Sequence, residues 1–199
     1  HTYETEYHDE CRTIYRDFLT GLKDYGYCIK CVFITGITKF TQISLFSTLN
    51  TLVNISFEDS LAAVCGITNQ ELLFYFQKEI AMLSEKCNLS EADTINEMKS
   101  LYDGYHFAPN MLNVYNPYSV LSAFSRGKLN SYWIASGSNE MLFKILNKFA
   151  KDIPKLDNCL IDADYLEESD VNMIDPKLFL YQAGYLTIKA VDGDMYTLG

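Results

Sequence analysis

The chain has 199 residues and a formal net charge of −10, from 16 lysines and arginines against 26 aspartates and glutamates. This acidity counts against nonspecific binding to nucleic acid or to an anionic membrane, because both need a basic face. Apolar residues make up 48% of the chain and aromatic residues 14%. A chain with this much apolar side-chain surface can form a buried core, which excludes an intrinsically disordered protein.

Six cysteines are scattered along the chain, and Cys28 and Cys31 form a Cys-x-x-Cys pair. No second pair or histidine pair completes a zinc site, so we predict buried free thiols and no metal ligands. The polar residues 1–10 do not resemble a signal peptide, and no apolar run reaches the roughly 18 residues of a membrane span. These features predict a cytoplasmic protein that does not cross a membrane.

The first predicted elements are a helix and a buried strand. Apolar residues recur at helical spacing over residues 11–22, with charged residues on the other side. After Gly26, residues 31–35 predict a short strand buried on both faces and ended by Gly36. One strand cannot be a sheet by itself, so we expect residues 1–57 to be the end of an α/β core. The other strands of that core would then come from elsewhere.

Residues 58–165 predict a helical domain. Thr68 and Glu71 form a capping box, and further helix starts are expected at Ser90, Asn116 and Ser138. Pro117 after Asn116 strengthens the third of these signals, because proline is favoured in the first helical turn. Apolar residues follow each start at helical spacing, which predicts that each helix buries one side.

The last residues, 166–199, predict a short helix followed by a β-hairpin. The helix is expected over residues 176–184, where a glycine ends it. The strands 185–191 and 195–198 flank Asp192-Gly193-Asp194, a strong hairpin signal. Helices followed by a small hairpin resemble a winged-helix arrangement. The predicted fold class is therefore mainly α with minor β.

An aromatic loop is predicted over residues 102–109. We expect Gly104 to turn the chain with a positive φ while Tyr105 and Phe107 fill the gap between helices. His106 is a candidate catalytic base, but no partner carboxylate or nucleophile stands at a known spacing. A hydrogen-bonded structural histidine is therefore the preferred interpretation.

Asp93, Glu97 and Lys99 match the Asp…Glu-x-Lys pattern of metal-dependent nucleases. Such groups converge on a metal from strands, whereas these lie on a capped helix, so we interpret them as a solvated helix face. The sequence contains no P-loop motif, no Rossmann glycine motif and no Gly-x-Ser-x-Gly elbow. From the residues alone we assign no catalytic residue and no metal ligand.

Several segments occur in an order that is familiar. They include Phe33-Ile-Thr-Gly-Ile-Thr-Lys-Phe40 and Tyr102-Asp-Gly-Tyr-His-Phe107, with residues 44–50, 65–68, 114–120, 132–133 and 179–189. Together they resemble a predicted AAA-ATPase-like family of bacteria that is often fused to a C-terminal PD-(D/E)XK-type nuclease domain. The resemblance covers about residues 15–189.

The resemblance implies that the phosphate-binding loop and the magnesium-holding acidic strand lie upstream of this chain, and that a nuclease domain follows it. The chain would comprise the last strand of a P-loop α/β core (1–57), a helical lid (58–165) and a winged-helix-like segment (166–199). ATP and magnesium would be cofactors of the full-length protein, with none bound by this chain alone. Thr35 would be a polar nucleotide sensor and Lys39 a weaker phosphate contact. The alternative is that Thr35 and Gly36 form only a strand-ending turn.

Three functions follow. The leading hypothesis is a non-catalytic C-terminal portion of an AAA-like ATPase, inactive alone, that couples nucleotide state to an adjacent effector domain. Its partners would be the upstream ATPase half and a possible C-terminal nuclease domain, without nucleic acid or membrane. The alternative is a winged-helix module with no nucleotide role that binds a protein or DNA, aided by Lys177 and Lys189. A third is a hydrolase with a site around Asp103 and His106.

Overall fold

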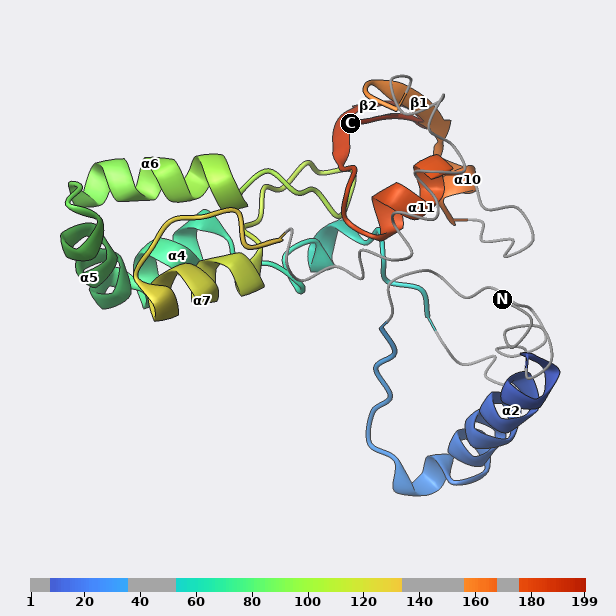
Figure 1. The fold of residues 1–199 in the computed structure, drawn as a ribbon. Helices are drawn as coiled ribbons and strands as arrows, with labels where there is room; N and C mark the ends of the chain where they lie inside the picture. The colour runs from blue at the N-terminus through green and yellow to red at the C-terminus, as the bar shows by residue number, and fades with distance from the viewer. Residues whose placement is uncertain (1–7, 36–52, 134–155, 168–175) are drawn as a thin grey trace.

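The computed structural model describes residues 8–35, 53–133, 156–167 and 176–199 (Figure 1). Helices are its commonest elements, and one small antiparallel sheet of three strands lies near the C-terminus. The predicted class, mainly α with minor β, is confirmed. Within these residues, no helix combines the length and apolar character needed to cross a membrane.

The predicted first helix is present as α2 (His8–Asp24), followed by a 3-10 turn, η1 (Gly26–Cys28). Its apolar side is only partly covered, because Leu19 is buried whereas Ile14 and Phe18 are 62% and 64% exposed. In Figure 1 α2 and the extended segment after it project away from the other labelled elements. The local sequence therefore specifies the helix, but the described residues do not bury the side that it prepares for packing.

The prediction of a buried strand at residues 31–35 is wrong for the described structure. These residues are extended and exposed and belong to none of the three strands. Phe33 is 62% exposed, and Val32 and Ile34 are 39% and 45% exposed. A strand forms only where a neighbouring strand pairs with its backbone N–H and C=O groups. The strands of the sheet near the C-terminus pair with one another, and none of them pairs with residues 31–35.

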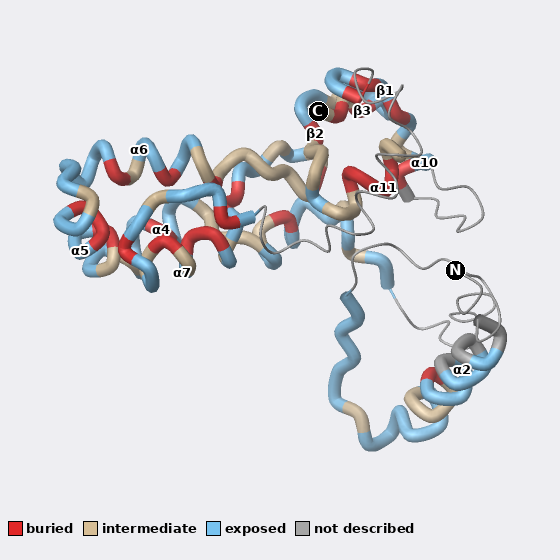
Figure 2. The backbone as a smooth tube through the Cα atoms, in the orientation of Figure 1, coloured by how far each residue is buried: buried red, intermediate tan, exposed pale blue. Residues whose placement is uncertain are grey.

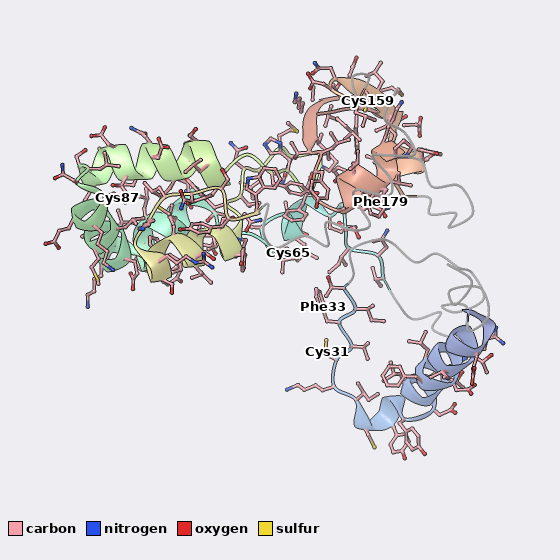
Figure 3. All side chains as sticks on the ribbon, in the orientation of Figure 1. Cys31, Phe33, Cys65, Cys87, Cys159 and Phe179 are labelled. Atoms are coloured by element: carbon pink, nitrogen blue, oxygen red, sulfur yellow. The ribbon has the colours of Figure 1, made fainter. Side chains whose placement is uncertain are left out.

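The predicted burial of the cysteines is also wrong for three of the described ones. Cys28, Cys31 and Cys65 are exposed, Cys87 is half-buried and Cys159 is buried. None of these five described cysteines forms a disulfide. Figure 3 shows Cys31 on the extended segment 31–35. Cys31 is exposed because no described strand pairs with this segment.

The helical unit comprises residues 67–133, with helices α4 (Asn69–Tyr75), α5 (Gln77–Cys87), α6 (Glu91–Tyr102) and α7 (Pro117–Arg126). A short 3-10 turn, η2 (Asp59–Leu61), precedes it. The buried positions face the interior of the unit (Figure 2). Its core consists of Leu72, Ile80, Leu83, Met98, Tyr102, Tyr115, Val120, Ala123 and Tyr132.

The predicted capping signals begin three of these helices. Thr68 and Glu71 form both hydrogen bonds of a capping box at α4. Ser90 accepts a bond from the backbone N–H of Asp93 at α6, and Asn116 accepts one from Ser119 at α7. The helix expected after Ser138 lies outside the described residues.

The C-terminal unit comprises β1 (Cys159–Asp162), α10 (Ala163–Glu167), α11 (Pro176–Gln182), β2 (Ile188–Asp192) and β3 (Met195–Leu198). The strand order is β1-β3-β2, and both pairs are antiparallel. The predicted hairpin at Gly193 is present, with φ of 58° at that glycine. The sequence did not predict β1, which pairs Cys159 with Leu198.

The core of the C-terminal unit draws on residues from both sides of the predicted boundary at residue 166. Ile161 on β1, Leu166 on α10, Tyr181 on α11 and Ile188 on β2 are all buried in one cluster. The strand β1 and the helix α10 therefore pack with the hairpin that follows them.

Candidate functional site

The structure describes one of the two residues that the resemblance implies as nucleotide contacts. Thr35 is exposed in the extended segment, at the edge of the described residues. Lys39 lies outside the described residues. Their role in binding phosphate therefore stays a prediction.

The nuclease-like triplet lies on the solvated side of α6. Asp93, Glu97 and Lys99 are all exposed, and Asp93 is in the first turn, where a negative charge favours the helix dipole. In the part of the chain that the structure describes, no group of three or more metal-ligating side chains is placed around one point. The interpretation of these residues as a helix face is confirmed.

The basic spot expected near the hairpin is partly neutralised. The Nζ of Lys189 on β2 lies 2.6 Å from Oδ1 of Asp157, and this ion pair lowers the pKa of the Asp157 carboxyl. The adjoining turn carries Asp192 and Asp194, both exposed. These charges give the hairpin little attraction for a phosphate backbone.

The segment between α6 and α7 joins the two units. Figure 1 shows it running from the helical unit to the C-terminal elements. The hydroxyl of Tyr105 donates to the backbone carbonyl of Tyr181 at 3.0 Å. The backbone N–H of His106 donates to Oγ1 of Thr187 at 2.8 Å. Residues about 80 positions apart in the sequence therefore meet at this junction.

The His106 ring is hydrogen-bonded on both sides, which agrees with the structural interpretation of this histidine. Its Nδ1 lies 2.6 Å from the carbonyl oxygen of Ile188, and its Nε2 lies beside Oδ1 of Asn113. Because a backbone carbonyl oxygen only accepts, Nδ1 is the donor in the first of these bonds. The ring is thus used for holding backbone, and the neighbouring Asp103 is occupied by a bond from the N–H of Gly104. This arrangement provides no hydrolytic nucleophile–base pair.

Aromatic rings surround these hydrogen bonds. The Tyr105 ring meets Phe107 edge-on at 4.6 Å and stacks with Tyr181 at 6.4 Å. Phe57 stacks on Tyr181 at 6.2 Å. Burial raises the pKa of the Tyr105 and Tyr181 hydroxyls well above the usual value, so both stay neutral. A neutral Tyr105 hydroxyl can donate to the carbonyl throughout the physiological pH range.

A cavity of about 210 Å³ lies at the same junction. Its lining includes Tyr105 and Trp133 from the helical side, Tyr185 from the C-terminal unit, and the exposed Cys65. Among the described residues that line it, none carries a formal charge. A charged phosphate would find no counter-charge there, so the cavity does not resemble a nucleotide-phosphate site.

Sequence reasoning found the loop but not what it contacts. The aromatic content of residues 102–107 signalled a packed loop, and Gly104 has the expected positive φ of 104°. Nothing in the sequence indicated that Thr187 and Tyr181 would be its partners, because a hydrogen bond with a backbone group on one side leaves no paired residue-type signature.

Comparison with known proteins gives one informative match. No family model matches the chain, and no solved structure matches it. The chain is 29% identical over 182 residues to an uncharacterized protein in the vnfD 5′ region of Azotobacter chroococcum mcd 1. The match covers 92% of this chain and 33% of that protein, so the chain spans about a third of the relative's length. The relative's description attaches no activity to it.

Proposed function

We propose that this chain is a non-catalytic part of a predicted AAA-like ATPase, and that it couples nucleotide state to an adjacent effector domain. In this proposal α2 and residues 31–35 belong to the P-loop α/β core, the helical unit is the lid, and α11 with the β2–β3 hairpin is a winged-helix-like end. ATP and magnesium would bind to the core in the full-length protein.

The exposed strand-like segment carries the proposal. Val32, Phe33 and Ile34 form a β-branched and aromatic run that is exposed although burying each such side chain contributes about 1.5–3 kcal/mol. Ile14 and Phe18 on α2 are exposed as well. An α/β sheet needs both features, a strand buried on both faces and a helix whose apolar side covers it.

The length of the matched relative supports the part of the proposal in which this chain belongs to a longer protein. The matched region is a third of that protein, which leaves room for a phosphate-binding loop and for an effector domain. The helical unit suits a lid because it has its own core, and a lid can therefore move as one body against the core.

The decisive experiment replaces Thr35 in the full-length protein. Thr35→Val is nearly isosteric and removes only the hydroxyl that would contact the γ-phosphate or the attacking water. We expect turnover of ATP to fall roughly 10- to 1000-fold, as when an oxyanion donor is lost, with little change in ATP affinity. Thr20→Val is the control, because the Thr20 hydroxyl donates within α2, to the carbonyl of Arg16.

Two results would contradict the proposal at different levels. Unchanged turnover in Thr35→Val would show that Thr35 is only a turn residue. A full-length protein that neither binds nor hydrolyses ATP would refute the ATPase assignment. The alternative, a winged-helix module that binds a protein or DNA and has no nucleotide role, would then lead. The exposed segment at 31–35 can also pair with a strand of a protein partner.

A further inference from the structure

Two adjacent residues, Tyr105 and His106, make hydrogen bonds between the two units, beside the ring contacts of the junction. Tyr105 reaches Tyr181 on α11, while His106 reaches Thr187 and Ile188 at the start of β2. In each of these bonds, one of the two partners is a backbone group: the carbonyl of Tyr181, the N–H of His106 or the carbonyl of Ile188. Such bonds hold the two backbones in one relative position, whereas apolar contacts tolerate sliding.

On the helical side, the loop is fixed to the end of α6. The N–H of Asn116 donates to the carbonyl of Tyr102 at 2.8 Å, and the N–H of Val114 donates to the carbonyl of Tyr105 at 3.3 Å. Gly104 turns the chain between them with φ of 104°. A movement of α6 therefore carries Tyr105 with it.

On the other side, the contacted residues are fixed to the end of the hairpin. Thr187 and Gly199 exchange two backbone hydrogen bonds, at 3.0 and 3.1 Å. Residue Thr187 therefore moves together with the backbone that leads out of β3. The loop is thus rigidly tied to α6 on one side and to Gly199 on the other.

We propose that Tyr105 and His106 form a latch that opens as a unit, and that its opening is the step by which the helical unit transmits a change to whatever follows residue 199. This inference rests on the proposed function for the nature of the signal, but not for the existence of the latch. Opening the latch would break a few hydrogen bonds and separate the stacked Tyr105 and Tyr181 rings, next to a cavity of about 210 Å³. Coupling of this kind requires an element with two discrete arrangements, which in this proposal are the latch with its bonds made and the latch with its bonds broken.

Hydrogen exchange of the His106 amide, followed by NMR, tests whether the latch opens as a unit. Tyr105→Phe removes a hydroxyl that does not touch this amide. We expect the variant to speed exchange of the His106 amide about 2- to 13-fold, which corresponds to one net hydrogen bond. The amide of Ile80, which is bonded within the helical unit to Phe76, should exchange at an unchanged rate.

Two further variants control this measurement. Tyr132→Phe removes the same type of bond inside the helical unit, from Tyr132 to the carbonyl of Lys128, and should leave the His106 amide unaffected. Thr187→Val should release the His106 amide, whereas Thr187→Ser keeps the hydroxyl and should restore its protection. An unchanged His106 amide in Tyr105→Phe, or equal acceleration at Ile80, would overturn the latch.

The same amide in the full-length protein tests the transmitted signal. We expect its exchange rate to change at least threefold when a non-hydrolysable ATP analogue is added. A protein that binds the analogue without any change at His106 would overturn the coupling role. A protein that binds no ATP would refute the proposed function instead, and the exchange data on Tyr105→Phe would still decide whether the latch exists.

Discussion

A methyl group added at Gly66 should destabilise the helical unit. A Cβ at this position would lie 2.4 Å from Cβ of Val114 and 2.5 Å from its Cγ2. Carbon atoms pack at about 3.5–4.0 Å, so one of the two backbones must move by more than 1 Å. Val114 cannot yield by changing rotamer, because the nearest atom is its Cβ, and it is almost fully buried.

The close approach is maintained by the neighbouring backbone. Ile67 and Tyr115 exchange two hydrogen bonds, at 3.1 and 2.8 Å, directly beside the Gly66–Val114 contact. Moving the two backbone segments apart would stretch these bonds and disturb the neighbouring bridge between Val114 and Tyr105. Overpacking of this kind costs about 1–3 kcal/mol. With a urea slope of about 2 kcal/mol/M, the unfolding midpoint should fall by about 0.5–1.5 M.

Urea unfolding followed by circular dichroism measures this effect. Gly21→Ala is the control, since a Cβ at Gly21 meets nothing within 4 Å and alanine favours the α2 helix. Val114→Ala should not rescue Gly66→Ala, because the clashing Cβ remains, whereas Val114→Gly should relieve the clash. An unchanged midpoint in Gly66→Ala, or full rescue by Val114→Ala, would refute the steric argument.

Two further predictions concern single residues of the helical unit. Gly104→Val should lower the free energy of unfolding by about 1–3 kcal/mol through backbone strain alone, because Gly104 has φ of 104° and its Cβ would meet nothing within 4 Å; Gly26→Ala, also without a steric neighbour, should be nearly neutral in the same urea titration. Hydrogen bonds from Thr68 lower the pKa of Glu71 below 4.5, so this carboxylate contributes stability that is fully present above pH 4.5 and is lost as the pH falls through the folded-state pKa. Glu71→Gln should therefore be less stable than the parent at pH 6, and the difference should shrink as the pH falls through the folded-state pKa; a difference that is independent of pH would contradict this.

The sequence by itself determined the elements whose causes lie within a few residues. The capping box at Thr68 and the N-cap at Asn116 work through backbone N–H groups three positions away. The hairpin at Gly193 depends on a turn whose positive φ the glycine permits. Such interactions are complete within one turn of chain, so their sequence patterns predicted the structure correctly.

Tertiary structure decided the features that need a distant partner. Residues 31–35 have the composition of a buried strand, but no described neighbour pairs with them, and they stay exposed. The strand β1 forms because β3 supplies its backbone partner across Cys159 and Leu198. His106 is a structural residue because Ile188 brings a carbonyl to its ring. Backbone groups recognise one another without regard to side-chain identity, so only the folded chain reveals which of them meet.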